Sequence, residues 1–389
     1  MTKPLPAVVN SMRPLDVGIA GAGLAGRCLA WRLLRAGHRV SLLDRRQRDA
    51  QDTASMAAAA MLSPLAELAV SDAVVFALGQ RSMELWPQWI AELHSSHPAP
   101  DAEPVYYRQQ GTLVLAHAPD QSSMQHFTQL LRHKLPASHR DRVQALDATA
   151  VAALEPALGG RFHSGLYLQG EGQLANDQWM ASLAQELDRL GVVWHEGVQV
   201  HGLQAQRMQA RRVVAGNAMD SSAGARGTRH GEELDIAVDL VVDARGVGSK
   251  PLLRTLRGVR GEVLRVSCPG VQLQRPVRLM HPRYMLYVAP RPDHQFVVGA
   301  TELESEDTGP VTLRSMLELG SALYSLHPAF GEARVERLSA ALRPALDNDQ
   351  PACMLQDGVW HINGLYRHGY LCAPALVESL MQKILEASP

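Results

Sequence analysis

The sequence predicts an α/β protein in which a Rossmann-like unit is interleaved with an α+β unit built on a mainly antiparallel sheet. Three observations carry this prediction. Residues 16–44 alternate between strand, glycine-rich turn, helix and strand, residues 240–246 form a second apolar strand that ends in small residues, and residues 262–301 hold several short strand-like segments. With 389 residues, 46% of them hydrophobic, the chain is long enough for two such units.

The N-terminal segment has the element order of a dinucleotide-binding unit. Residues 16–20 (D-V-G-I-A) indicate a buried strand, residues 24–36 have the apolar spacing of a helix, and residues 39–43 (R-V-S-L-L) indicate a second strand that leads to Asp44. An acid at this place can accept a hydrogen bond from a ribose hydroxyl. A glycine-rich surface turn is the alternative, but it would not require that acid.

The turn between these elements reads G-A-G-L-A-G, and each glycine has a physical reason. Gly21 permits the tight strand-to-helix turn, Gly23 lets the backbone approach a pyrophosphate at the helix N-terminus, and Gly26 allows helix and strand to pack closely.

The remaining elements follow from periodicity and from turn residues. Asn176 is expected to cap a helix that Gly191 ends. Residues 216–232 are rich in Gly, Ser and Ala and are expected to form an exposed loop between two strands. We expect helices at 72–94, 120–134, 176–190 and 313–326, strands at 111–117, 192–198 and 240–246, and an antiparallel meander at 262–301.

A run of small residues follows the first unit, and further motifs recur along the chain. Residues 53–64 read T-A-S-M-A-A-A-A-M-L-S-P, which suits a backbone lying close against a bulky ligand. With M-L-x-P in 57–64, G-A-T at 299–301, L-R-P at 342–344 and Y-R-H-G-Y-L-C-A-P at 366–374, the chain resembles the glycine oxidase branch of the D-amino-acid oxidase superfamily, flavoenzymes that carry FAD. The motifs stand in the family's order and span the chain.

The resemblance implies two domains through which the chain passes in turn. The expected FAD-binding domain comprises residues 14–104, 145–256 and 335–389, and the expected substrate-binding domain comprises residues 105–144 and 257–334.

The resemblance also implies which residues hold FAD. The strand end at Val198 would lie on the adenine side, and the turns at Gly246 and Gly248 would pass near the pyrophosphate. Cys372 falls in the C-terminal motif, where a covalent flavin link is conceivable, but the matched branch binds FAD non-covalently. The expected cofactor residues are Gly21, Gly23, Gly26, Asp44, Ala59, Ala60, Met61, Val198, Gly246, His368, Gly369, Tyr370 and Leu371.

The substrate of such an enzyme carries a carboxylate, for which the planar guanidinium is the matching partner. Arg343 in L-R-P matches the family arginine that binds this carboxylate, and Tyr287 matches the tyrosine beside it. Arg367 falls where the family has another arginine near the flavin. The alternatives are an ion pair of Arg343 with Asp347 or Asp349, and a packing role for Tyr287.

Three departures from the family pattern affect the choice of substrate. His368 stands where asparagine is common, and Met285 stands where a histidine can occur. Glu302 follows G-A-T where some members have an apolar residue; an acid there would favour a substrate ammonium and disfavour bulky apolar side chains. These departures leave glycine, sarcosine and small D-amino acids open as substrates.

Composition narrows the function classes. The net charge of −1 gives no reason to expect nucleic acid or an anionic membrane as a partner, and no apolar run reaches the length of a membrane span. Four scattered cysteines without a C-x-x-C pair fit a reducing cytoplasm, and the sixteen histidines show no metal-binding spacing, so no metal is expected. Residues 1–15 are interpreted as a short arm and not as an export signal.

The resemblance thus implies FAD-dependent oxidation of glycine, or a related small amino acid, to its imine. Hydride would pass to the flavin and oxygen would reoxidise it, for the thiazole branch of thiamine biosynthesis. An FAD-dependent D-amino-acid or sarcosine dehydrogenase with another electron acceptor, and a flavin-binding module without turnover, are the alternatives. A plain NAD-dependent dehydrogenase is disfavoured by residues 57–64. The expected partners are a small amino acid and oxygen, and a homo-oligomer stays open.

Overall fold

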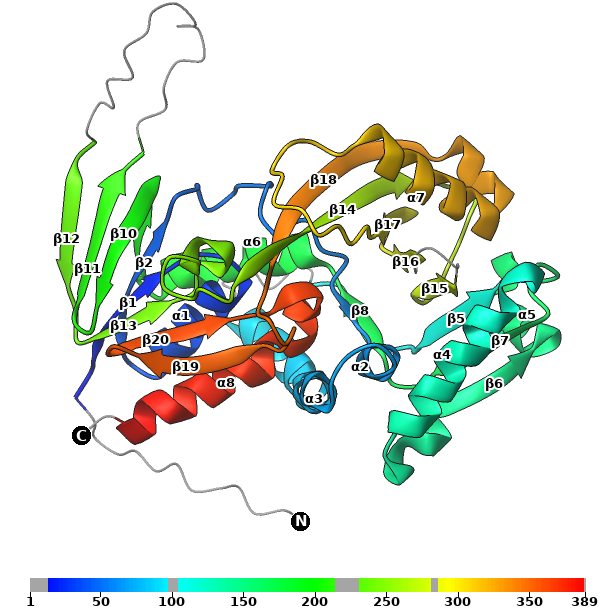
Figure 1. The fold of residues 1–389 in the computed structure, drawn as a ribbon, viewed down its shortest axis with the longest axis horizontal. Helices are drawn as coiled ribbons and strands as arrows, with labels where there is room; N and C mark the ends of the chain where they lie inside the picture. The colour runs from blue at the N-terminus through cyan, green and yellow to red at the C-terminus, as the bar shows by residue number, and fades with distance from the viewer. Residues whose placement is uncertain (1–12, 97–103, 214–230, 281–285, 388–389) are drawn as a thin grey trace, which may run out of the picture.

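The computed structural model describes residues 13–96, 104–213, 231–280 and 286–387. In Figure 1 two large sheets lie side by side, with helices packed against each.

The first sheet has six strands, of which five are parallel and β19 is antiparallel. Its glycine-rich turn, helix and flanking strands confirm the predicted unit at 16–44. The strand order is β19 (Ala352–Gln356), β20 (Val359–Asn363), β13 (Leu240–Asp243), β1 (Asp16–Ala20), β2 (Arg39–Asp44) and β9 (Val193–Glu196).

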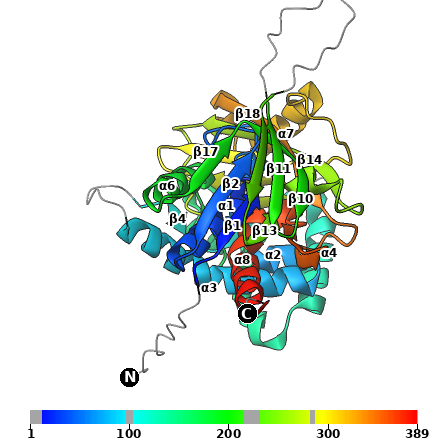
Figure 2. The same ribbon diagram turned by 90° about the vertical axis from the view of Figure 1, so that its left-hand side faces the viewer.

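Helices and a small sheet cover this first sheet. The helices are α1 (Leu24–Arg35), α3 (Ala73–Ser95), α6 (Asn176–Arg189) and α8 (Gly369–Ala387). Their core holds four fully buried tryptophans with ring centroids 4.8–6.4 Å apart, Trp31, Trp86, Trp89 and Trp179. Figure 2 faces the small antiparallel sheet of β10 (Val198–Gln204), β11 (Arg207–Arg212) and β12 (Glu233–Ala237). Met208 of β11 fills the space over Gly18 of β1, where a Cβ would lie 2.4 Å from the methionine methyl group.

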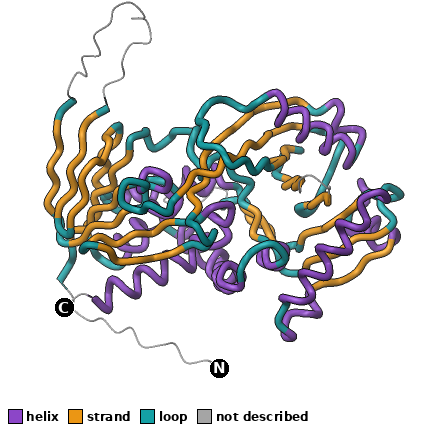
Figure 3. Tube along the Cα trace, viewed as in Figure 1, coloured by secondary structure: helices purple, strands orange, loops and turns teal. Residues whose placement is uncertain are grey.

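The second sheet has eight strands and is antiparallel except where β15 runs parallel to β5. The order is β18 (Arg334–Ala345), β14 (Arg257–Ser267), β17 (Gln295–Gly299), β16 (Leu286–Pro290), β15 (Val277–Met280), β5 (Thr112–Ala116), β7 (Ser164–Leu168) and β6 (Val143–Asp147). Three helices accompany it, α4 (Gln121–Lys134), α5 (Ala148–Leu154) and α7 (Leu313–Leu326). Figure 3 shows α7 in purple along the outside of this sheet.

A short three-stranded sheet and one short helix connect the two halves. These elements are β3 (Met61–Leu62), β8 (Gly172–Leu174), β4 (Tyr107–Arg108) and α2 (Pro64–Leu68). None of the described helices is both long enough and apolar enough to cross a bilayer.

The structure corrects the expected domain boundaries. β6 and β7 pair with each other and extend the second sheet from β5, so the boundary at residue 145 is wrong and this unit continues to about residue 168. β18 pairs with β14 along its whole length, so the return at residue 335 is wrong too and comes after Ala345. At both boundaries, the domain to which the strand belongs is determined by the strands with which it pairs and not by its own sequence pattern.

Two smaller expectations are also wrong. The strand predicted at 192–198 breaks at Gly197, whose φ of 67° ends β9 before β10 begins in another sheet. Asn176 does not cap α6, because Ala175 takes the N-cap position. The Asn176 side chain instead donates hydrogen bonds to the segment at Ser55 and Met56. The loop expected at 216–232 lies almost wholly outside the described residues.

Candidate active site

A cavity of about 670 Å³ is lined by residues of both large sheets and of α8. Gly26 is an exception among the expected site residues, because it does not line the cavity. The expected residues that do line it are Gly21, Gly23, Asp44, Ala59, Ala60, Met61, Val198, Gly246, Gly248, Tyr287, Arg343, Arg367, His368, Gly369, Tyr370 and Leu371.

The three glycines of the first turn serve different purposes. Gly21 has a φ of 102°, and a Cβ there would lie 2.5 Å from the Ala244 carbonyl oxygen. A Cβ on Gly26 would lie 1.9 Å from the Gly21 oxygen, so Gly26 sets the contact between helix and turn and not a cofactor contact. Gly23 has no atom within 4 Å of its Cβ position, which leaves open space at the N-terminus of α1.

Asp44 orders this turn from the end of β2. Its Oδ2 accepts a hydrogen bond from the Ala22 amide at 2.7 Å, and its Oδ1 accepts one from the Arg46 amide at 2.8 Å. The carboxylate still borders the cavity, at the place where a ribose hydroxyl would be expected.

The alanine-rich segment is held from behind by a buried amide. Asn176 Nδ2 donates to the Ser55 and Met56 carbonyl oxygens at 2.9 and 3.0 Å, and Asn176 Oδ1 accepts from Arg265 Nη2 at 2.7 Å. The Tyr370 hydroxyl donates to the Ser55 oxygen at 3.0 Å. Asn176 is therefore a positioning residue for this segment, a function that its place at a helix start concealed.

These residues fit the expected FAD. The open space at Gly23 faces a helix N-terminus, which favours a pyrophosphate, and the cavity wall at 57–60 carries alanine side chains only. Cys372 is fully buried and not part of the wall; its Sγ lies 3.8 Å from the Val75 oxygen. A covalent link through this thiol therefore has no geometric basis.

Arg343 borders the same cavity from β18. Its Nη1 donates to the Thr301 carbonyl oxygen at 3.1 Å, and the guanidinium rests on Gly261, where a Cβ would lie 2.3 Å from Nη2. Within the described part of the chain it forms no ion pair, and Asp349, an alternative partner, pairs with Arg257 at 2.7 Å. The guanidinium is thus available to a carboxylate in the cavity.

Arg367 also borders the cavity, but two carboxylates already occupy it. Its Nε lies 3.1 Å from Glu67 Oε2 and its Nη1 lies 3.0 Å from Glu302 Oε2. Arg367 is therefore less available than Arg343 to a substrate carboxylate.

Glu67 of α2 and Arg278 of β15 complete this charged wall, and the sequence did not reveal either. Glu67 Oε1 lies 2.7 Å from Arg278 Nη2. Burial opposes the ionisation of Glu67, but the charges of Arg278 and Arg367 outweigh it and lower the pKa of Glu67 to about 2. The only available signal was a single acid in the otherwise apolar segment S-P-L-A-E-L-A-V.

His368 lies beside this pair as a neutral imidazole. Its Nδ1 is 3.3 Å from Glu67 Oε2, yet the two atoms form no hydrogen bond. Burial lowers the pKa of His368 to about 4, although the charge of Glu67 acts in the other direction. The contact is therefore not an ion pair at neutral pH.

The buried His368 and Glu67 predict a loss of stability in acid. Both pKa values lie below the ordinary 6.5 and 4.5, so the unfolded chain binds more protons, and stability falls as pH drops from 6.5 to 4 for His368 and from 4.5 to 2 for Glu67. The contribution of each group is on the order of 3 kcal/mol. Denaturant unfolding of His368→Asn should show a weaker pH dependence between pH 6.5 and pH 4 than the unaltered protein; equal dependence would contradict this assignment.

Tyr287 of β16 borders the cavity near Arg343. A Cβ on Gly299 would lie 2.9 Å from the Tyr287 hydroxyl, so the glycine provides the space for this ring. Burial raises the pKa of Tyr287, against the charge of Arg343, and the phenol stays protonated and able to donate a hydrogen bond.

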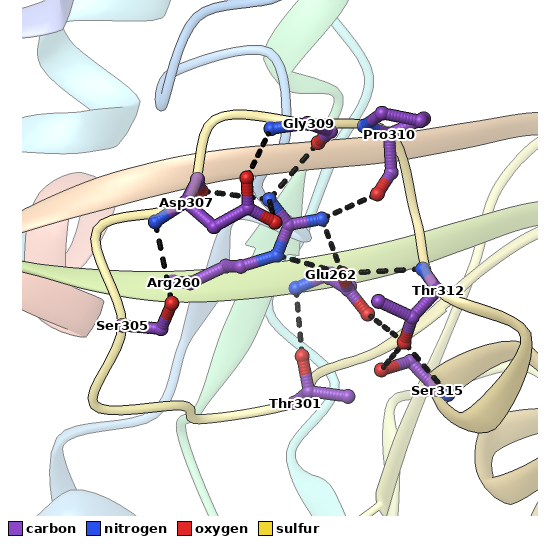
Figure 4. A network of polar contacts seen from close by, with 9 residues as sticks. All are labelled: Arg260, Glu262, Thr301, Ser305, Asp307, Gly309, Pro310, Thr312 and Ser315. Atoms are coloured by element: carbon purple, nitrogen blue, oxygen red, sulfur yellow. Dashed lines mark hydrogen bonds and ion pairs between the residues drawn. The ribbon is translucent and has the colours of Figure 1, made fainter.

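A buried ion pair fixes the segment after β17, as Figure 4 shows. Arg260 Nε donates to Glu262 Oε1 at 2.7 Å, and its other nitrogens donate to the Asp307, Gly309 and Pro310 carbonyl oxygens. The Glu262 amide donates to Thr301 Oγ1 at 2.9 Å. The network thereby holds in place the carbonyl oxygen that contacts Arg343.

Comparison with known proteins is consistent with this geometry. Residues 16–381 match the family model described as "DAO: FAD dependent oxidoreductase". The chain is 36% identical over 367 residues to the "Putative thiamine biosynthesis oxidoreductase ThiO" of Rhizobium etli, covering 94% of this chain and 95% of the relative. It is 24% identical to glycine oxidase of Bacillus licheniformis over 95% of this chain and 93% of that one. The crystal structure of glycine oxidase from Geobacillus kaustophilus superposes with a TM-score of 0.77 at 22% identity, over 97% of this chain and 96% of that one, and so shares the fold.

Proposed function

The chain belongs to the DAO family of FAD-dependent oxidoreductases, and we propose that it oxidises glycine, or a closely related small amino acid, to the imine. One observation carries the proposal beyond the family: the Arg343 guanidinium borders the cavity without a carboxylate partner among the described residues. An unpaired cation in a partly buried site favours an anionic ligand. The names of the relatives support the choice of glycine.

In this proposal the protein binds and orients the substrate. The Arg343 guanidinium holds the substrate carboxylate with two parallel hydrogen bonds, and the Tyr287 hydroxyl donates a further one. When bound, FAD supplies the acceptor for the electron pair and hydrogen that leave the substrate Cα. The N-terminus of α8 begins at Gly369 in the cavity wall, where its positive end would stabilise negative charge. The substrate amine must be neutral at this step, so a substrate that arrives as the ammonium first gives its proton to water, and no protein side chain is assigned as a base.

The proposal extends to oxygen as the final electron acceptor, to the thiazole branch of thiamine biosynthesis and to a cytoplasmic location. The name of the Rhizobium etli relative supports the pathway. A homo-oligomer is compatible with the apolar side chains that α7 exposes, Leu313, Leu317 and Tyr324, and light scattering of the purified protein would test it.

The decisive experiment is an anaerobic titration of the FAD-loaded protein. Glycine, sarcosine and D-alanine are added in turn, and bleaching of the visible flavin absorbance is followed. Glycine should bleach it, and air should then restore the colour with formation of peroxide. Bleaching without recovery in air would favour the dehydrogenase, and no bleaching by any of the three amines would leave a binding module without turnover.

A further inference from the structure

The cavity wall around Arg343 carries an unequal number of charges. Among the described residues, two carboxylates and three guanidiniums border this part of the cavity, and the neutral His368 adds nothing, so their net charge is about +1. The charged groups are Glu67, Glu302, Arg278, Arg343 and Arg367. One substrate carboxylate neutralises this net charge, whereas a second carboxylate would leave the pocket with an excess negative charge.

Glu302 contributes one negative charge to this count because its carboxyl group is ionised. Its Oε1 accepts a hydrogen bond from the Tyr366 hydroxyl at 2.5 Å, and its Oε2 lies 3.0 Å from Arg367 Nη1. Its side chain keeps 46% of its surface exposed, so burial opposes its ionisation only in part. The Tyr366 hydrogen bond and the charges of Arg367 and Arg343 outweigh that burial and lower the pKa of Glu302. Both oxygens are engaged within the protein, so the expected direct contact with a substrate ammonium is not favoured.

The backbone holds Glu302 at this place. Its neighbour Leu303 exchanges two hydrogen bonds with Arg260, at 2.9 and 3.0 Å, and the Thr301 amide donates to the Glu262 oxygen at 3.2 Å. These strand-like contacts tie both flanking residues to β14, next to the buried ion pair of Figure 4. A ligand therefore meets the negative charge of Glu302 and cannot easily displace it.

We propose that Glu302 determines specificity by keeping the net charge of the pocket at one, so that small acids with a single carboxylate bind and those with a second carboxylate are rejected. This inference rests on the proposed function, because it assumes that Arg343 binds the substrate carboxylate. A second carboxylate would meet Glu302 and find no unpaired guanidinium among the described residues. The substrate class is thereby narrowed to monocarboxylic amino acids.

Two small acids that lack an amine test the proposal on the FAD-loaded protein: glycolate, with one carboxylate, and malonate, with two. Affinity is measured by calorimetry and by perturbation of the flavin spectrum. The unaltered protein should bind glycolate about tenfold more tightly than malonate, and Glu302→Gln should narrow or reverse that ratio by about tenfold. Glu304→Gln is the matched control, because Glu304 is exposed, pairs with Arg257 and does not border the cavity.

Two outcomes would overturn the proposal. The first is malonate binding to the unaltered protein as tightly as glycolate. The second is an unchanged ratio in Glu302→Gln, which includes an equal weakening of both acids and would indicate a merely structural role. The first needs no variant and stands even if Glu302→Gln does not fold. Failure of the proposed function would be seen in a different experiment, as the absence of flavin bleaching by glycine, sarcosine and D-alanine. The ratio of glycolate to malonate affinity is measured without turnover and does not depend on that result.

Discussion

Replacing Arg343 with alanine is expected to lower kcat/KM for glycine by a factor on the order of 10³, with FAD binding nearly unchanged. The expected loss corresponds to a charge-assisted, two-pronged contact with the substrate carboxylate, worth several kcal/mol. FAD binding should be spared because Arg343 lies on β18, outside the glycine turn and the alanine-rich wall that are expected to hold FAD. Steady-state kinetics and a flavin titration measure the two effects separately.

Arg334→Ala is the matched control for this experiment. Arg334 begins the same strand and its side chain is exposed, so its loss should change neither kinetics nor FAD binding. Equal losses of substrate and FAD binding in Arg343→Ala would mean that the carboxylate site lies elsewhere.

The second large effect is expected in the glycine turn, where a substitution at Gly26 should lower stability and a substitution at Gly23 should abolish FAD binding. Gly26→Ala places a Cβ 1.9 Å from the Gly21 oxygen, so helix and turn must separate, at a cost of about 3 kcal/mol or more. Gly23→Asp meets no atom, has an ordinary φ of −76° and provides a helix N-cap. The apoprotein should keep its stability yet lose FAD, because the new carboxylate would occupy the place of the pyrophosphate.

Thermal unfolding of the apoproteins and flavin absorbance of the reconstituted proteins measure these effects. Gly320→Ala in α7 is the control, since its Cβ position is open and alanine favours helices; stability should rise slightly with FAD binding intact. If Gly23→Asp bound FAD as well as the unaltered protein, the assignment of this turn would be wrong.

The parts of the fold that follow from short-range pattern could be predicted. The unit at 16–44 depends on a glycine turn and two flanking strands, all close in sequence. The domain boundaries could not be predicted in this way, because they depend on which strands pair. β6 joins the second sheet by pairing with β7, which pairs with β5, and nothing in the residues of β6 indicates this partner.

The residues of the site likewise divide into those that a local motif predicts and those that only the folded chain brings together. Arg343 and Tyr287 could be predicted from their motifs. Glu67 and Arg278 could not, because they are 211 positions apart and meet only in the folded chain. Asn176 was recognised as a residue that begins a helix, yet its side chain serves the segment at Ser55 and Met56, which periodicity cannot reveal. Partners of buried polar groups are the information that a single sequence lacks.

The most direct test of the central claim is a crystal structure of the FAD-loaded protein with glycolate bound. FAD should lie along the glycine turn, and the glycolate carboxylate should lie within hydrogen-bond distance of the Arg343 guanidinium. Glycolate bound at another arginine, with Arg343 turned into solvent, would contradict it.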